Sequence, residues 1–101
     1  MRIISKKTLK DFYEQKLYKD SKNSLEAWHQ EVLKANWNNP NEVKKQFGNS
    51  SVVGDNRIVF NIHGNKYRLI VKINYFAQIM LIRFIGTHKQ YDNINGKADK
   101  I

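Results

Sequence analysis

The hydrophobic period of the sequence changes near the middle of the chain, and this change limits the possible folds. Up to Gly48 the apolar residues recur at the three- and four-residue spacing of amphipathic helices. From Arg57 onward they form short runs of β-branched and aromatic residues, which are typical of strands. The sequence therefore predicts helices followed by a sheet, which is an α+β fold. With 101 residues and no low-complexity tract, we expect residues 1–101 to form a single domain.

The helical half begins with two amphipathic segments that we expect to form a hairpin. Their apolar faces consist of residues at helical spacing, Leu9, Phe12, Tyr13 and Leu17 in the first segment and Leu25, Trp28, Val32 and Ala35 in the second. A third, short helix is predicted after Asn39, because Pro40 can occupy its first position and Glu42 completes a capping pattern. Residues 49–56 are predicted to be a loop.

The second half contains three predicted strands, at residues 57–62, 67–75 and 79–85. The connections between them are short enough for hairpins, so the strands should form an antiparallel meander. Residues 1–4 could add a fourth strand. We therefore expect an N-terminal helical hairpin packed on one face of a small antiparallel sheet, which leaves the other face for function.

Basic residues outnumber acidic ones, and the excess lies mainly in the second half. The 18 Lys and Arg against 9 Asp and Glu give a net charge of +9, and residues 56–101 hold only two of the acids, Asp92 and Asp99. This balance favours a polyanionic partner, either a nucleic acid or an acidic protein. The chain has no cysteine for disulfides or thiol catalysis. It also has no apolar stretch long enough for a membrane helix, so we expect a cytoplasmic protein without membrane contact.

Four basic residues of the predicted strands are candidates for binding a phosphate. Arg68 and Lys72 are four residues apart and so share one face of a strand. Lys66 stands at the entrance of that strand, and Arg83 lies on the next one. For any single one of them, solvation of an open sheet face is the slightly stronger explanation. Arg68 is the strongest candidate, because it interrupts an apolar run.

A histidine and a tyrosine after the last strand could supply proton transfer. His88 and Tyr91 are three apart, which places both side chains on one side of a helical turn. Histidine titrates near neutrality and can act as acid or base. An exposed histidine beside a tyrosine that packs on the sheet is the alternative. His29 is predicted to be structural and His63 incidental. These three histidines are too scattered for a metal site, so we expect no metal and no cofactor.

Three stretches of the sequence resemble a known family. They are residues 56–71, which contain Asn61, Lys66 and Arg68, residues 82–92, which contain His88 and Tyr91, and the opening residues 1–5. Together they closely resemble the HigB-like toxins of type II toxin–antitoxin systems, within the RelE superfamily. The resemblance extends nearly from end to end, and it is most specific between Asn61 and Tyr91.

The resemblance implies a RelE-like fold and a ribosome-associated endoribonuclease that cleaves messenger RNA. It also implies neutralisation by a HigA-type antitoxin with a helix-turn-helix. In this superfamily an arginine matching Arg68 holds the scissile phosphate, and residues after the last strand, here His88 and Tyr91, complete the site. The sequence departs from RelE-like toxins with lysines on the preceding strand, since it has Val59 and Asn61 there. His88 is therefore the expected proton carrier.

The resemblance and the residues together give each candidate a role. Arg68 and Lys66 would neutralise the phosphorane, His88 would move a proton, and Tyr91 would orient or stack. Flanking RNA contacts are expected from the remaining polar candidates, Asn61, Lys72, Arg83 and Lys89. Two alternatives remain at this point. One is a non-enzymatic toxin that inhibits a protein such as gyrase, as in the ParE branch of the superfamily, and the other is an RNA-binding module without catalysis.

Overall fold

The change of period at residue 57 separates a helical half from a sheet half, as predicted. The structure is a computed structural model that describes residues 1–94 and 96–101. Its elements follow in the order β1 (Arg2–Ile4), α1 (Lys6–Tyr13), the 3-10 helix η1 (Lys16–Ser21), α2 (Lys22–Leu33), α3 (Pro40–Gln46), β2 (Ser51–Val53), β3 (Arg57–Ile62), β4 (Tyr67–Asn74), β5 (Ile79–Thr87), α4 (His88–Asp92) and the 3-10 helix η2 (Ala98–Lys100). The predicted α+β class is confirmed.

The described strands form one five-stranded sheet in the order β1-β5-β4-β3-β2. Strands β2 to β5 pair antiparallel, which confirms the predicted meander. Strand β1 adds an edge beside β5 but runs parallel to it, so the sheet is mixed rather than purely antiparallel. Two parallel strands must be joined by a long stretch of chain. Here the helices α1 to α3 and the strands β2 to β4 form the connection between β1 and β5.

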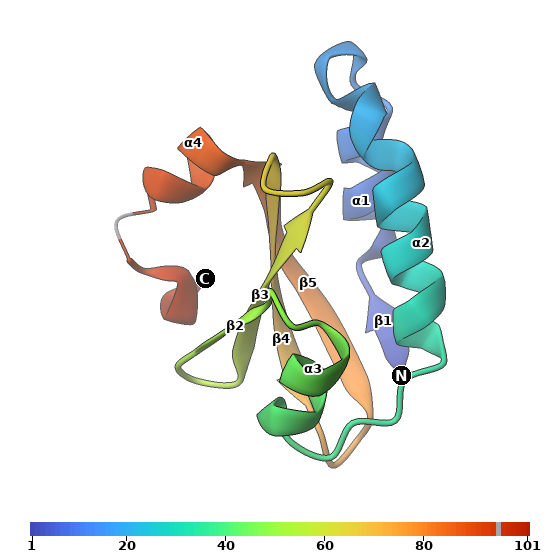
Figure 1. Cartoon of the computed structure of the whole chain (residues 1–101), viewed down its shortest axis with the longest axis vertical. Helices are drawn as coiled ribbons and strands as arrows, with labels where there is room; N and C mark the ends of the chain where they lie inside the picture. Colours follow the sequence, from blue (N-terminus) through green and yellow to red (C-terminus); the bar gives the residue numbers. More distant parts are fainter. Residues whose placement is uncertain (95) are drawn as a thin grey trace.

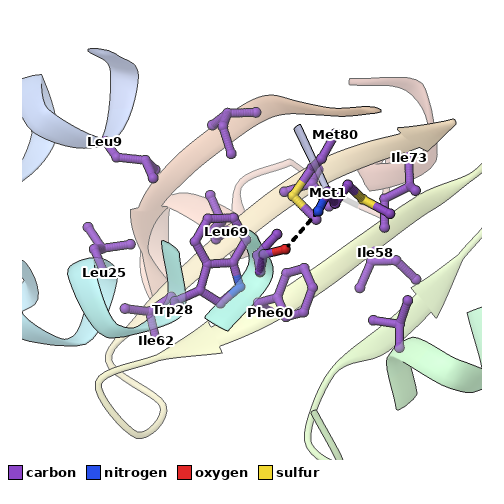
Figure 2. Packing of buried hydrophobic residues seen from close by; sticks show 14 of the residues in the cluster. Met1, Leu9, Leu25, Trp28, Ile58, Phe60, Ile62, Leu69, Ile73 and Met80 are labelled. Atoms are coloured by element: carbon purple, nitrogen blue, oxygen red, sulfur yellow. Dashed lines mark hydrogen bonds between the residues drawn. The ribbon is translucent and has the colours of Figure 1, made fainter. Parts of the chain in front are cut away.

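Helices α1 and α2 lie side by side on one face of the sheet, which we call the helix face (Figure 1). Trp28 of α2 packs edge-on against Phe60 of β3, with ring centroids 5.4 Å apart, and Leu9 and Leu25 lie in the same buried cluster (Figure 2). The amino group of Met1 donates to carbonyls near the end of α2, including that of Ala35 at 2.8 Å. The helical hairpin is thus fixed to the sheet both by apolar packing and by the first residue.

The first helix is shorter than the pattern predicted, and Leu17 does not belong to its apolar face. Helix α1 ends at Tyr13, and Leu17 lies in η1 with 80% of its surface exposed. Tyr18 takes the inward place instead, because its ring stacks on Phe12 at a centroid distance of 4.4 Å. The prediction was wrong here since the tighter turn of η1 rotates the next residue toward the core.

The predicted loop at residues 49–56 contains a strand. Residues Ser51–Val53 form β2 and pair with β3, so this part of the prediction was wrong. The strand is only three residues long and lies at the edge of the sheet, where its side chains are mostly exposed. A strand of this kind leaves little hydrophobic pattern in the sequence.

The other face of the sheet is covered in its middle by the C-terminal segment, and we call it the C-terminal face (Figure 1). Val59 of β3, Ile70 of β4 and Ala98 are buried together in a small second cluster. Ile94 and Tyr91 pack against this cluster. The sequence predicted an open face, whereas the middle of this face is buried under residues near the C-terminus.

Candidate functional site

Arg68 lies on β4 at the end of the C-terminal face that α4 borders. In the strand register it stands between Asn61 of β3 and Gly86 of β5. Its guanidinium donates to the carbonyl of Asn65 over 2.9 Å, and its Cζ lies 5.9 Å from the centre of the Tyr91 ring. The cation is therefore held by a backbone oxygen and an aromatic ring, and no carboxylate pairs with it among the described residues.

The first turn of helix α4 is held by two reciprocal capping bonds between Thr87 and Gln90. The hydroxyl of Thr87 accepts from the backbone of Gln90, and the side chain of Gln90 accepts from the backbone of Thr87 over 2.8 Å. The backbone N–H of His88 donates to the carbonyl of Lys66 over 3.1 Å. These bonds tie the start of α4 to the β3–β4 turn.

Gly86 makes the close approach of α4 and β5 possible. A Cβ at this position would lie 2.6 Å from Cζ of Phe84 and 2.7 Å from Oε1 of Gln90. Any side chain would therefore displace Phe84 or the capping side chain of Gln90.

His88 contacts a carboxylate that the sequence analysis did not single out. Its Nδ1 lies 2.8 Å from Oδ2 of Asp92, one helical turn later, and both side chains are about half exposed. The spacing of four residues was visible in the sequence and could have pointed to this pair. We call Arg68, His88, Tyr91 and Asp92 the α4 cluster. It contains a cation in contact with an aromatic ring and, on the same helix as the ring, a histidine paired with a carboxylate.

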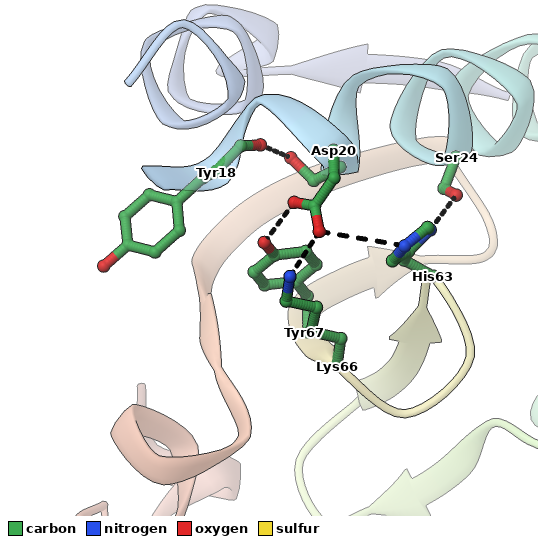
Figure 3. A network of polar contacts seen from close by, with 7 residues as sticks. Tyr18, Asp20, Ser24, His63, Lys66 and Tyr67 are labelled. Atoms are coloured by element: carbon green, nitrogen blue, oxygen red, sulfur yellow. Dashed lines mark hydrogen bonds and ion pairs between the residues drawn. The ribbon is translucent and has the colours of Figure 1, made fainter. Parts of the chain in front are cut away.

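Lys66 belongs to a second polar group, which bridges the β3–β4 turn and the helical hairpin (Figure 3). We call Asp20, His63, Lys66 and Tyr67 the Asp20 cluster. One carboxylate oxygen of Asp20 accepts from the ammonium of Lys66 and the other from the hydroxyl of Tyr67. Nε2 of His63 lies 3.8 Å from the same carboxylate, and its Nδ1 lies 3.3 Å from the hydroxyl of Ser24. His63 was predicted to be incidental, and the structure places it in this cluster.

The contacts of the Asp20 cluster shift its pKa values in opposite directions. Hydrogen bonds from Lys66 and then Tyr67 hold the pKa of the Asp20 carboxyl below its usual value. The same bond to Asp20 raises the pKa of Lys66. Burial, followed by the bond to Asp20, raises the pKa of the Tyr67 hydroxyl. All three pKa shifts favour a charged Asp20–Lys66 ion pair beside a protonated Tyr67 hydroxyl.

The four predicted RNA contacts are not gathered in one place. Asn61 stands directly across from Arg68, and its amide donates to the carbonyl of Asn49 over 3.0 Å. Lys89 is exposed on α4 next to His88. Lys72 lines a hollow with Asn56 and Asn74 toward the other end of β4. Arg83 lies at a bulge of β5 and donates to the carbonyl of Ile101 over 2.7 Å.

His29 and the groove between α1 and α2 lie apart from the α4 cluster. His29 is buried on α2, where burial lowers the pKa of its imidazole, and this agrees with the predicted structural role. A groove of about 620 Å³ between α1 and α2 is lined by Leu9, Lys10 and His29, and no residue of the α4 cluster borders it. Within residues 1–94 and 96–101 no group of three potential metal ligands comes together. No helix in these ranges is long and apolar enough to cross a membrane.

Comparisons with known proteins identify similar sequences. Residues 21–94, which include the whole α4 cluster, match a family model described as HigB_toxin, the RelE-like toxic component of a toxin–antitoxin system. Similar curated proteins are the mRNA interferase toxin HigB of Escherichia coli K12 and the mRNA interferases HigB of Escherichia coli O157:H7 and Shigella flexneri. Each is 32% identical to this chain over 94 residues, which cover 91% of the chain and 88% of the relative.

Proposed function

Because the chain belongs to the HigB family of RelE-like toxins, we propose that it is the toxin of a toxin–antitoxin system and cleaves messenger RNA. The names of the curated relatives support the endoribonuclease activity. We further propose that cleavage occurs on the ribosome, that no metal takes part, and that a HigA-type helix-turn-helix protein is the antitoxin. The net charge of +9 supports a polyanionic substrate.

The observation that carries the proposal is the arrangement of the α4 cluster. Arg68 has no carboxylate partner among the described residues, and its guanidinium faces the Tyr91 ring at 5.9 Å. His88 lies on the same short helix as Tyr91 and is half exposed. A phosphate bound by Arg68 would thus lie beside a ring on which a base can stack, and we propose that it also lies within reach of His88 on the same helix.

The residues of this cluster can carry out the steps of metal-free RNA cleavage. Arg68 donates two parallel hydrogen bonds to phosphate oxygens and remains charged while negative charge grows on the phosphorane. His88 moves a proton, and Tyr91 orients or stacks on a neighbouring base. The 2′-oxygen attacks phosphorus, so the products are a 2′,3′-cyclic phosphate and a 5′-hydroxyl. Asn61 and Lys89, which border Arg68 and His88, hold flanking RNA.

Three of the candidate cations lie outside this centre in our proposal. Lys66 holds the β3–β4 turn through Asp20, and its carbonyl positions α4. Lys72 and Arg83 lie farther along the C-terminal face and contact RNA beyond the scissile phosphate. Their contribution is to affinity, which falls as salt is raised.

The proposal is tested with purified protein, isolated ribosomes and a defined messenger RNA. We expect cleavage in a chelator at a concentration that leaves the ribosomes intact, and products that end in a 2′,3′-cyclic phosphate. The same reaction without ribosomes measures their contribution. Activity that requires added metal on intact ribosomes would contradict the metal-free mechanism. Growth arrest with unimpaired translation and damaged DNA would contradict RNA cleavage and favour a gyrase inhibitor.

A further inference from the structure

We propose that Asp92 is a positioning residue that fixes the tautomer of His88 and thereby makes His88 the general base of the reaction. The inference rests on the proposed function and assigns a role within the same site. It starts from the contact between Oδ2 of Asp92 and Nδ1 of His88, which measures 2.8 Å. A neutral imidazole can donate to a carboxylate only from a protonated nitrogen. The contact therefore places the proton on Nδ1 and leaves the lone pair on Nε2.

The backbone around this pair is held from several directions. The capping bonds of Thr87 and Gln90 fix the first turn of α4, and the bond from His88 to the carbonyl of Lys66 fixes its position against the β3–β4 turn. At the other end the N–H of Asn93 donates to the carbonyl of Lys89. The imidazole and the carboxylate thus project from a single anchored turn, so their contact does not depend on a mobile loop.

Phosphate binding does not explain a carboxylate at this position. Asp92 is one of two acidic residues in residues 56–101, and it lies on the same short helix as Tyr91, whose ring contacts Arg68. A carboxylate near a phosphate clamp repels the substrate and weakens polyanion binding. Asp92 makes no ion pair with Arg68 or Lys89 among the described residues. Its one described side-chain contact is with the imidazole of His88.

The role of Asp92 follows from the proton movement in the first step. Nε2 of His88 takes the proton of the 2′-hydroxyl as the 2′-oxygen forms a bond to phosphorus. His88 becomes an imidazolium, and Asp92 stabilises this charge without itself taking the proton. The bond from phosphorus to the 5′-oxygen then breaks, and the 5′-oxygen receives a proton from water. His88 returns to its neutral form by releasing the proton from Nε2 to solvent.

The test compares Asp92→Asn and Asp92→Ala with a matched control, Asp11→Asn. Asp11 is also an exposed carboxylate that pairs with a residue four positions away on a helix, Lys7 at 3.9 Å. Nitrogen-15 chemical shifts of the His88 ring report which nitrogen carries the proton, independently of activity. Single-turnover cleavage of messenger RNA on ribosomes gives the rate, its dependence on protein concentration gives the affinity, and thermal unfolding monitors the fold.

We expect both Asp92 variants to shift the neutral His88 ring from the Nδ1–H form toward a mixture with the Nε2–H form. The maximal cleavage rate should fall roughly 10- to 100-fold, by analogy with carboxylates that orient metal-bound histidines. Apparent RNA affinity should stay equal or improve, and Asp11→Asn should change none of these quantities. A merely structural contact on the helix surface would alter the melting temperature slightly and leave the rate unchanged.

Two results would overturn the inference. One is an unchanged His88 tautomer in the Asp92 variants, and the other is full cleavage activity despite a changed tautomer. His88→Ala separates these failures from a failure of the proposed function. If His88→Ala is inactive while Asp92→Asn is fully active, only the role of Asp92 is wrong. If His88→Ala cleaves normally, the proton-transfer role of His88 is wrong as well.

Discussion

Two polar clusters at the same end of the sheet contain the same kinds of residue but pair them differently. The Asp20 cluster and the α4 cluster each contain a carboxylate, a histidine, a tyrosine and a cation. In the Asp20 cluster the carboxylate takes both the cation and the phenol as partners. In the α4 cluster the carboxylate bonds to the histidine, and the cation is left with the Asn65 carbonyl and the Tyr91 ring.

From this difference we propose that the Asp20 cluster supports the fold and that the α4 cluster acts on the substrate. Asp20 joins residues that are 46 and 47 positions away along the chain, so it fixes the β3–β4 turn to the helical hairpin. A cation that is already paired with a carboxylate must lose that partner before it can bind phosphate. Arg68 has no carboxylate partner to lose among the described residues. Its hydrogen bond to the Asn65 carbonyl is weaker than an ion pair, so binding phosphate costs less.

Arg68→Ala should reduce cleavage more strongly than the other substitutions considered below. Losing one charged donor of a preorganised site costs roughly 10²- to 10³-fold in rate, or about 3–4 kcal/mol. The melting temperature should hardly change, because Arg68 is not part of either apolar cluster. Arg68→Lys should restore part of the activity, since it keeps the charge but not the two parallel bonds.

The control for this prediction is Arg2→Ala, an exposed arginine on β1. Initial cleavage rates and thermal unfolding of all three variants decide the outcome. A folded Arg68→Ala protein that cleaves at the normal rate would remove the α4 cluster from the mechanism.

A smaller effect is expected for Gly86→Ala, which changes the position of α4 without removing a functional group. The new Cβ would lie within 3 Å of Phe84 and Gln90, so one of them must move and the cap of α4 is disturbed. Overpacking of this kind costs about 1–3 kcal/mol of stability. We expect a fall in cleavage of roughly 10-fold, because a misplaced group reacts more slowly.

Gly48→Ala is the matched control, since a Cβ there meets no atom within 4 Å. The melting temperature and the single-turnover cleavage rate should both be clearly lower for Gly86→Ala than for Gly48→Ala. Equal behaviour of the two variants would mean that the close contact at Gly86 does not position the site.

The smallest effect on cleavage is expected for Asp20→Asn, which should act on stability instead. The variant loses the ion pair with Lys66, so its free energy of unfolding at neutral pH should be lower than that of the wild type. The maximal cleavage rate should change by less than about threefold, because α4 is bonded to the backbone carbonyl of Lys66 and not to its side chain, and an exposed ion pair contributes little energy. Denaturant unfolding at several pH values measures the stability, with Asp11→Asn as the control.

The stability difference between the wild type and Asp20→Asn should depend on pH in a defined direction. The pKa of Asp20 is lowered in the folded state, so its contribution is present above its unfolded pKa of about 4. The contribution is lost as the pH falls through the folded value. The two proteins should therefore converge in acid, and a difference that persists or grows there would contradict the Asp20 network.

The order of elements could be predicted from the sequence because local periodicity encodes it. The three central strands and the helical hairpin follow from the spacing of apolar residues, and Asn39 caps α3 as its pattern predicted. The end of α1 could not be located, since Leu17 and Tyr18 are both plausible inward residues. The choice depends on the stacking of Tyr18 on Phe12 and its edge contact with Tyr67, a residue distant in sequence.

The candidate residues were recognisable in the sequence, but their partners were not. Arg68 contacts the Tyr91 ring, and His88 lies on the same short helix as Tyr91, while the roles predicted for the three residues stay predictions. The pairing of Lys66 with Asp20 could not be anticipated, because 46 residues separate them and no local pattern connects them. Asp92 was within reach of sequence reasoning, as its spacing from His88 is that of one helical turn.

We expect RNA to bind at the α4 cluster and not at the Asp20 cluster. The most direct test is a nuclear magnetic resonance titration of the protein with a short RNA whose 2′-hydroxyl is methylated, which prevents cleavage. We expect the largest amide shifts at Arg68, at Gly86 and along α4, with little change at Asp20 or His63. Shifts confined to the Asp20 cluster, or to the groove between α1 and α2, would contradict this placement of the site.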